Sequence, residues 1–534
     1  MTDDELKNLF LIEIEKILNS NTKSLRDYQS VPYPEMSDNK LIEEELAYDT
    51  KELTHTNLYT EQKMTHEQRL VFDEILNAVI TDSGSFYFVY GDGGCGKTFI
   101  WNGLSSAIRS IGKIVLNVAS SGIASLLLPS GRMTHFRFSI PITITDESTC
   151  NIKYGSLKAE LLIQSSLIIW DETPILNKMC FEALDRTLRD LMSVTNQHKT
   201  HQPFGSKVVA LGGNFKQIFL VVPKGSRHDI LTTTVNSSHL WSFCKVLKLH
   251  TNMRLLISSS DQDEGEMKRL ANWILDIENG NIGSVVGDES EIEISDNLLI
   301  TTTDDPLSPN LLQNMSDYRY FHSRVILAPT LESVDKVNNF VLTIFLRMEN
   351  EYLSSETTCQ ADENEHFTLE FLNDIKCSGL PNHKLILKLG IAVMLLRNID
   401  QTSGLCNGTR LIVNELGSNV IGATVVTGRN IRDKVYIPRM NLIPSDSGLS
   451  FKFQQRQFPL TVCFVMTINK SHQDQSLSHV GLYLPKSVFT YGQLYLALSR
   501  VKGRSGLRDL FLDEDGNPKS STTNVVFKEV FNNI

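Results

Sequence analysis

The pattern of apolar and polar positions predicts strands and helices that alternate along most of the chain. From about residue 61, short runs rich in β-branched and aromatic residues are separated by segments whose apolar residues recur at helical spacing. The runs are FYFVY at 86–90, KIVLNVAS at 113–120, SLIIWDE at 166–172, KVVALGG at 207–213 and VLKL at 246–249, and a second set begins with RVILAPT at 324–330. Strands that alternate with helices predict a parallel sheet with helices on both faces.

In the second half of the chain, a series of strand-like runs without intervening helical segments interrupts this α/β pattern. Strand-like runs such as KLILKLG and GTRLIVNEL follow one another closely, with Gly and Asn turns between them. Such spacing predicts a small all-β barrel, and the return of the α/β texture at FPLTVCFVMTINK indicates that the barrel is an insertion. The predicted division is a lead-in at 1–60, a first α/β domain at 61–248 with a small insertion near 130–160, a second α/β domain at 249–351 and 451–534, and the barrel at 352–450.

Composition narrows the possible functions without selecting one. The 534 residues are 41% apolar and 21% charged, as in ordinary globular proteins. Because 51 Lys and Arg stand against 62 Asp and Glu, a net charge of -11 excludes a uniformly basic nucleic-acid wrapper, and any DNA contact must lie in a local groove. The 8 cysteines are scattered without a C-x-x-C pair, which predicts reduced thiols. An acidic start and the lack of a long apolar run predict a soluble intracellular protein.

The segment GDGGCGKT at 91–98 has the spacing of a phosphate-binding loop, with a predicted strand before it and a predicted helix behind it. Lys97 would reach the β- and γ-phosphates, and the Thr98 hydroxyl would bind Mg²⁺ at the helix start. The glycines that would let backbone N–H groups surround a phosphate are Gly91, Gly93, Gly94 and Gly96. A glycine turn that binds nothing is the alternative, and the Lys-Thr pair argues against it.

A buried strand ends in adjacent carboxylates at LIIWDE, residues 167–172. Asp171 would hold Mg²⁺, and Glu172 would act as general base on the attacking water. Read alone, such a pair is more often a solvated loop, and the upstream phosphate loop favours the functional interpretation. Hydrolysis also requires an arginine near the γ-phosphate, which spacing alone does not select.

Several further motifs carry a resemblance to a known family. They include ASSGIASLLLPSGRMTHFRFSIP at 119–141, LGGNFKQI at 211–218, LHTNMR at 249–254, LRNIDQTSGLCNGTRL in the predicted barrel, MTINKSHQDQSL at 466–477 and TYGQLYLALSRVKGRSGL at 490–507. With the phosphate loop and the WDE segment, in this order, the chain resembles the Pif-one DNA helicases of the RecD-like branch of helicase superfamily one (1B), and in particular the versions carried by plant Helitron transposons.

The resemblance implies two tandem RecA-like domains, with an SH3-like barrel inserted in the second. It implies ATP hydrolysis with Mg²⁺, 5'-to-3' movement along single-stranded DNA, and unwinding of forked duplexes by a monomer, or a dimer on DNA. It further implies a nuclear protein of replication, repair, recombination or telomere maintenance. Two alternatives stay open, which are a degenerate scaffold that binds ATP or DNA without unwinding and, more weakly, a phosphotransferase.

The resemblance also implies residue roles, which we state as expectations. Gln68 would read adenine, Gln217 would sense the γ-phosphate and the attacking water, and Arg254 and Arg500 would be presented by the second RecA-like domain. The residues expected to contact DNA are His135, Phe136, Thr467, Lys470 and Ser471.

The chain departs from the family pattern in two places. Asn214 and Lys216 stand where Asp and Arg are usual, and Leu220 lies near the position of a usual Pro. A residue is gained around His472, with Asp474 where Gly is expected, so an aspartate would crowd and repel the DNA backbone. These departures motivate the scaffold alternative.

Overall fold

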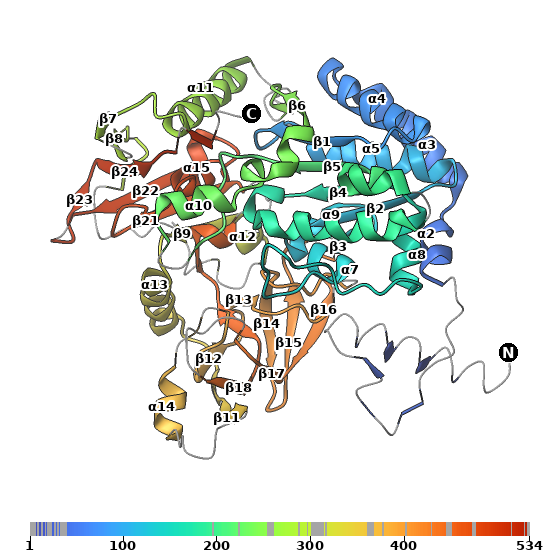
Figure 1. Ribbon diagram of the computed structural model, residues 1–534. Helices are drawn as coiled ribbons and strands as arrows, with labels where there is room; N and C mark the ends of the chain where they lie inside the picture. Colours follow the sequence, from blue (N-terminus) through green and yellow to red (C-terminus); the bar gives the residue numbers. More distant parts are fainter. Residues whose placement is uncertain are drawn as a thin grey trace. The chain divides into compact units, whose positions relative to one another are not determined.

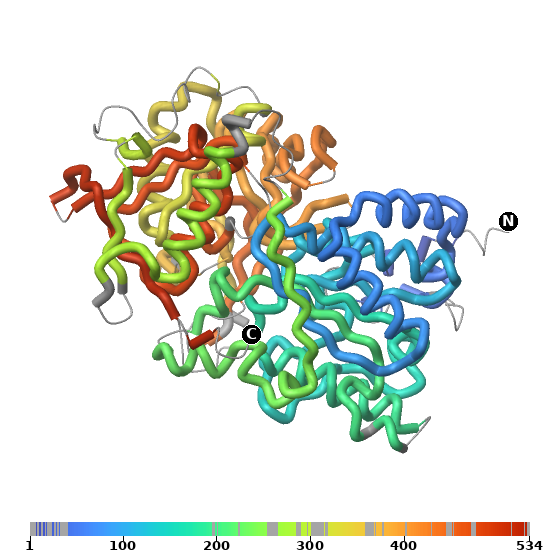
Figure 2. Tube along the Cα trace, turned by 90° about the horizontal axis from the view of Figure 1, so that it is seen from above, coloured from blue at the N-terminus to red at the C-terminus, as the bar shows by residue number. Residues whose placement is uncertain are grey.

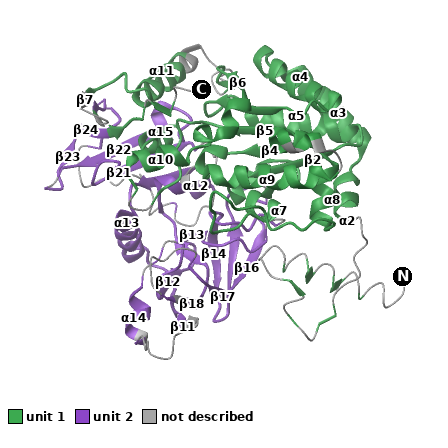
Figure 3. Ribbon diagram, in the orientation of Figure 1, with its two compact units in different colours: residues 1–290, 490–499, 524–534 green, residues 291–489, 500–523 purple. Residues whose placement is uncertain are grey.

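The structure is a computed structural model that forms two compact units (Figure 3). It describes residues 40–530 except 195–196, 223–224, 254–260, 287–288, 296, 301–313, 315–317, 360–367, 376, 378, 401–402, 429, 445–450, 472–476, 514 and 528, together with isolated positions before residue 40. The first unit comprises 1–290, 490–499 and 524–534, and the second comprises 291–489 and 500–523. Residues 249–290 thus group with the first unit, whereas the predicted domain boundary lay at 248. Compact units and domains are different divisions, and the domain boundaries remain predictions.

A six-stranded parallel sheet forms the centre of the first unit, as the alternating pattern predicted. The strand order is β3-β2-β4-β5-β1-β6. The strands are β1 Phe86–Gly91, β2 Ile114–Ala119, β3 Arg132–Met133, β4 Ser165–Asp171, β5 Val208–Gly213 and β6 Lys245–Leu249. Every pairing is parallel, and Tyr90 pairs with Gly213 while Ala119 pairs with Asp171. The carboxyl ends of the central strands therefore meet at one edge.

Helices cover both faces of this sheet, and α3 and α4 lie beside α5 (Figures 1 and 2). The helices of the first unit are α2 Lys40–Leu46, α3 Thr50–Lys63, α4 His66–Thr81, α5 Lys97–Ser110, α6 Gly122–Leu127, α7 Thr134–Phe138, α8 Leu157–Gln164, α9 Lys178–Ser193, α10 Arg227–Thr233, α11 Asp261–Glu278 and α15 Gln493–Leu498. No helix among the described residues is long and apolar enough to cross a membrane.

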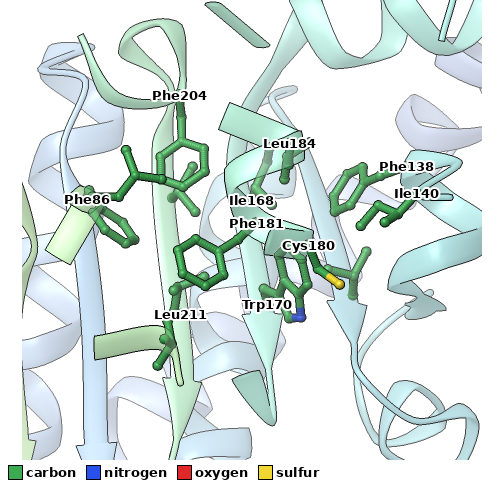
Figure 4. Close-up of a cluster of buried hydrophobic side chains, with 14 of the residues drawn as sticks. Phe86, Phe138, Ile140, Ile168, Trp170, Cys180, Phe181, Leu184, Phe204 and Leu211 are labelled. Atoms are coloured by element: carbon green, nitrogen blue, oxygen red, sulfur yellow. The ribbon is translucent and has the colours of Figure 1, made fainter. Parts of the chain in front are cut away.

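Alternate residues of each strand pack into different cores, as the two-residue repeat of a strand requires. Tyr87 and Val89 join the core that contains α4 and α5. Phe86 and Phe88 join the core that contains α9, whose Phe181 packs near Leu211 and Trp170 (Figure 4). Fully burying an aromatic or aliphatic side chain contributes about 1.5–3 kcal/mol. Two continuous cores therefore hold the central strands in place.

The second unit contains a second α/β sheet, with the order β20-β9-β21-β22-β23. Its strands are β9 Arg324–Ala328, β20 Val465–Thr467, β21 His479–Leu484, β22 Leu507–Leu512 and β23 Pro518–Lys519. All pairs are parallel except β22 with β23. The helices α12 Tyr318–His322 and α13 Leu331–Ile344 accompany it. A further small sheet has the order β24-β8-β7 and consists of β7 Ser284–Val286, β8 Glu289–Glu293 and β24 Ser521–Val525.

Antiparallel strands lie between β9 and β20 in the sequence. They are β10 Glu349–Leu353, β11 Ser355–Cys359, β12 Lys384–Lys388, β13 Ala392–Leu395, β14 Arg410–Leu416, β15 Val420–Val425, β16 Lys434–Pro438, β17 Met440–Leu442, β18 Lys452–Gln457 and β19 Leu460–Val462. Five of them form the sheet β16-β15-β14-β13-β19. The region also contains one short helix, α14 Leu369–Asp374. The SH3-like form of the barrel remains a prediction.

Candidate active site

The phosphate loop joins the end of β1 to the start of α5. Gly94 and Gly96 have φ angles of 95° and 81°, in the left-handed region that glycine adopts without strain. A Cβ on Gly96 would also lie 2.4 Å from Nε2 of Gln68. The Lys97 Nζ donates to the carbonyl oxygens of Gly91 at 2.6 Å and Asp92 at 3.4 Å. The ammonium is thus held against the loop, at the positive end of a helix where an anion is stabilised.

Gln68 fixes this loop to the first turn of α4. Its Oε1 accepts the Thr65 N–H at 3.1 Å, and the Thr65 side chain accepts the Gln68 N–H, which together form a capping box. Its Nε2 donates to the Cys95 carbonyl at 3.0 Å. Both ends of the buried amide are engaged in the fold, so the structure places Gln68 beside the phosphate loop. Its expected adenine contact remains a prediction.

The two candidate carboxylates lie at the carboxyl end of β4, and both are buried. Glu172 has a φ of 54°, an uncommon conformation for a residue with a side chain, which turns the chain sharply after Asp171. The Ser121 hydroxyl donates to the Glu172 Oε2 at 3.0 Å. Gly212 on β5 leaves room for Asp171, because a Cβ there would lie 2.7 Å from the Asp171 Oδ1. Both carboxylates thus lie at the carboxyl end of β4, with Asp171 against Gly212 of the neighbouring strand β5.

A tight turn follows β5 at residues 214–217, which we name the sensor turn. The Asn214 Oδ1 accepts the Lys216 N–H at 2.9 Å, and the Asn214 carbonyl accepts the Gln217 N–H at 3.2 Å. The Lys216 Nζ forms an ion pair with the Asp92 Oδ2 at 3.3 Å. The sensor turn is therefore tied to the phosphate loop through the lysine that departs from the family pattern.

Two buried groups that the sequence reasoning missed lie close to the sensor turn. The Asn214 Nδ2 donates to the Tyr495 hydroxyl at 3.2 Å, and both side chains are buried. Glu278 is fully buried at the end of α11, and burial raises its pKa well above the ordinary value while Lys216 lowers it. Helical spacing could have found Glu278, because it follows Ile274 by four positions on a face that also carries Leu270.

The structure describes one of the two expected arginines, Arg500, and not the other, Arg254. Arg254 lies outside the described residues, but the preceding Met253 donates its N–H to the Gly94 carbonyl at 3.0 Å. The chain before Arg254 is therefore held against the phosphate loop. Arg500 is buried in the second unit and directly follows the α15 segment of the first. Their expected roles remain predictions.

The residues expected to contact DNA fall into two groups, one in each unit. His135 and Phe136 lie on α7, where burial lowers the pKa of His135. Phe136 is half-buried, with the Lys158 Nζ 5.3 Å from its ring centroid, whereas the nearby Phe138 is a core residue.

In the second unit, Thr467 ends β20, and Lys470 and Ser471 lie in the 3₁₀ turn Ile468–Ser471. Burial lowers the pKa of Lys470. His472 and Asp474 lie outside the described residues, so the second departure from the family pattern has no structural account.

The phosphate loop between a parallel strand and a helix, with an acidic pair ending a neighbouring strand, defines a P-loop nucleoside triphosphatase with a RecA-like sheet. The profile of the PIF1-like helicases matches residues 63–288, and that of the 2B domain of DNA helicase Pif1 matches residues 370–416. The chain belongs to the PIF1-like helicase family.

Curated relatives agree with this assignment. The ATP-dependent DNA helicase Pif1 of Bdellovibrio bacteriovorus is 24% identical over 451 residues, which cover 83% of this chain and 88% of the relative. The zebrafish (Danio rerio) PIF1 is 24% identical over 85% of this chain and 62% of its own length.

Two solved structures share the fold. Bacteroides Pif1 bound to single-stranded DNA has a TM-score of 0.57 at 20% identity, covering 83% of this chain and 91% of that one. The Pif1 helicase of Candida albicans has a TM-score of 0.57 at 19% identity, covering 85% and 97%.

Proposed function

We propose that the protein is an ATP-dependent DNA helicase that moves 5'-to-3' along single-stranded DNA and separates forked duplexes. Membership of the PIF1-like helicases supports the activity. The observation that carries the proposal is the meeting, at one sheet edge, of the phosphate loop, the Asp171–Glu172 pair and the sensor turn. These groups match the three requirements of triphosphate hydrolysis, which are phosphate binding, a metal ligand with a general base, and a sensor of the γ-phosphate.

The donor set suits Mg²⁺, because the Thr98 hydroxyl and the Asp171 carboxylate are oxygen ligands. When bound, the ion would neutralise charge on the β- and γ-phosphates. Among the residues that the structure describes, no group of three or more His, Cys, Asp or Glu side chains could hold a metal alone. This agrees with Mg²⁺, which proteins usually hold with one or two side chains together with substrate phosphates.

In ATP hydrolysis the protein side chains would have the following roles. Lys97 exchanges its carbonyl partners at Gly91 and Asp92 for phosphate oxygens, which bind its charge more strongly. Glu172, oriented by Ser121 and by its left-handed backbone, accepts a proton from the attacking water. Gln217 positions that water, and Arg254 and Arg500 stabilise charge on the transferred phosphoryl group.

The route from hydrolysis to movement rests on the DNA-facing side chains. Phe136 would stack on bases, and Lys470 and His135 would contact phosphates, with stacking worth about 1–3 kcal/mol per base and little sequence preference. A nuclear location, roles in replication, repair, recombination or telomere maintenance, and a Helitron origin follow from the resemblance and belong to this proposal. One solved structure describes DNA unwinding at a fork by two coordinating Pif1 helicases. The present protein would likewise act on DNA as a monomer or as a dimer.

The test is an ATPase assay with and without single-stranded DNA, followed by unwinding of forks that carry a 5' or a 3' tail. We expect stimulation by DNA and unwinding that requires the 5' tail. Lys97→Ala should lower kcat at least about a thousandfold, since a lost phosphate contact acts in the transition state.

Lys153→Ala, which removes an exposed lysine of the same unit, is the matched control and should leave kcat unchanged. ATP hydrolysis that ignores DNA would favour the scaffold alternative and contradict the motor proposal.

A further inference from the structure

Residues 490–499 form a segment of the first unit although both flanking stretches belong to the second, and we name it the docking segment. Aromatic stacking holds its start in place. The Tyr491 ring lies 5.0 Å from Phe219 with an interplanar angle of 11°, and 5.1 Å from Phe527 with an angle of 10°. Three stacked rings from distant parts of the chain therefore fix the docking segment beside the end of the sensor turn.

Gly492 brings the docking segment into direct contact with the sensor turn. Its φ is 72°, and a Cβ there would lie 2.7 Å from the Lys216 carbonyl oxygen and 2.8 Å from the Gln217 carbonyl carbon. Only glycine combines this conformation with so close an approach of two backbones. The start of α15 is thus packed on the peptide that carries Gln217.

Tyr495 forms the second connection, through the Asn214 amide. Asn214 makes three hydrogen bonds. Its Oδ1 accepts the Lys216 N–H, its main-chain carbonyl accepts the Gln217 N–H, and its Nδ2 donates to the Tyr495 hydroxyl. Asn214 is 1% exposed and Tyr495 is 3% exposed. Because both side chains are buried, loss of the Tyr495 hydroxyl would remove the partner of the Nδ2 group.

The other end of Tyr495 leads to Arg500. The Tyr495 carbonyl accepts the Ser499 N–H at 2.9 Å, and Ser499 is the last residue before Arg500. One residue is therefore bonded through its hydroxyl to the centre of the sensor turn, and through its carbonyl to the residue that precedes the candidate arginine.

We propose that Tyr495 is a positioning residue for ATP hydrolysis, which through Asn214 holds the sensor turn and the chain entering Arg500 in one fixed arrangement. This inference rests on the proposed function, and it gives a role to a buried side chain outside the phosphate loop and the Asp171–Glu172 pair. A merely structural tyrosine would change stability alone. A positioning tyrosine changes kcat while ATP binding is preserved, because Gln217 and Arg500 would act in the transition state.

The experiment is a double-mutant cycle of Tyr495→Phe and Asn214→Ala in the full chain, with DNA-stimulated kcat, KM for ATP and the Kd of a fluorescent ADP analogue as readouts. We expect Tyr495→Phe to lower kcat about tenfold and to leave KM and Kd within about twofold. The double variant should be no slower than Asn214→Ala alone, because both changes remove the same hydrogen bond.

Thr490→Val is the matched control, because the Thr490 hydroxyl is a buried group of the same segment that has no hydrogen-bond partner. It should keep kcat within about twofold of the unmodified protein, as expected for removal of an unbonded hydroxyl. An unchanged kcat in Tyr495→Phe, or single effects that multiply in the double variant, would overturn the inference.

A second pair of variants guards against loss of folding. Asn214→Asp can still accept hydrogen bonds from the Lys216 N–H and from the Tyr495 hydroxyl, whereas Asn214→Leu can accept neither. We expect Asp to keep kcat within about threefold and Leu to lower it about tenfold. Equal rates for Asp and Leu would again overturn the inference. Absence of DNA-stimulated ATP hydrolysis in the unmodified protein would instead refute the proposed function.

Discussion

Asn214 illustrates how a single departure from a family pattern can be judged at the scale of one residue. The concern raised by the sequence was the lost negative charge. In the structure the side chain sits between two hydrogen-bond partners, the Lys216 N–H and the Tyr495 hydroxyl. An amide satisfies both, because it donates to the tyrosine where a carboxylate would accept from it. The substitution is therefore compatible with an ordered sensor turn.

Asp509 supports a prediction about pH. Its side chain is fully buried on β22 and has no hydrogen-bond partner among the described residues, and burial raises its pKa from the ordinary 3.8 to about 8. Between these values the folded protein binds a proton that the unfolded chain has lost, so stability falls as pH rises through this range and is lowest above pH 8.

The substitution Asp509→Asn should weaken the dependence of folding stability on pH. We expect the melting temperature of the variant to exceed that of the unmodified protein at pH 9 by several degrees, corresponding to about 1–3 kcal/mol. At pH 4 the two proteins should melt together, because a protonated carboxyl and an amide are both neutral. Parallel curves of melting temperature against pH would contradict the assignment.

The residues of the site were predictable from sequence where they stand in a spaced motif at a strand end. GDGGCGKT and WDE are of this kind, and strand alternation explains why they meet. Tyr495 lies within TYGQLYLALSRVKGRSGL, but neither Tyr495 nor Glu278 stands at a strand end, and their significance arises from contacts between distant segments. Asn214 and Tyr495, for example, are more than two hundred residues apart. The local pattern of apolar and polar residues cannot predict such long-range contacts.

At the scale of elements, α2 supports a prediction about the lead-in. Its Glu45 is buried between two arginines, pairing with the Arg109 Nη2 at 3.5 Å and with Arg137. Arg109 is buried as well and lies over the Tyr48 ring. Removing one member of a buried charge cluster leaves the others uncompensated, which typically costs about 3–5 kcal/mol.

Glu45→Ala should therefore lower the free energy of unfolding by about 3 kcal/mol. Glu43→Ala, on the exposed face of the same helix, is the control and should change it by less than about 0.5 kcal/mol. Chemical denaturation monitored by tryptophan fluorescence measures both. Equal effects of the two changes would show that the ion pairs do not hold α2 against α5 and α7.

Element positions followed closely from the run pattern, and the exceptions have physical reasons. The predicted run at 113–120 is the strand Ile114–Ala119, because a continuous β-branched run between turn residues suits a buried parallel strand. Ile111 is 56% exposed, since the preceding helix α5 ends at Ser110. The strand β3 has two residues, too few for any periodicity to reveal.

At the scale of the whole molecule, nucleotide binding should stabilise the fold. A ligand that binds only the folded protein adds about 2.7 kcal/mol at a hundred times its Kd. Thermal unfolding with ADP or a non-hydrolysable ATP analogue, in the presence of Mg²⁺, should show a rise of a few degrees. Lys97→Ala should abolish most of the rise and Lys153→Ala should keep it. An equal rise in all three proteins would place the nucleotide outside the phosphate loop.

The passage of the chain out of the second unit at residue 489 and back into it at residue 500 has a practical consequence. No single cut of the gene yields either unit whole. A fragment ending at residue 290 would lack both Tyr491 and Phe527, and would expose the aromatic face of Phe219 to water. Attempts to study the ATP-binding half in isolation would therefore need peptides equivalent to residues 490–499 and 524–534, supplied in trans or through engineered linkers.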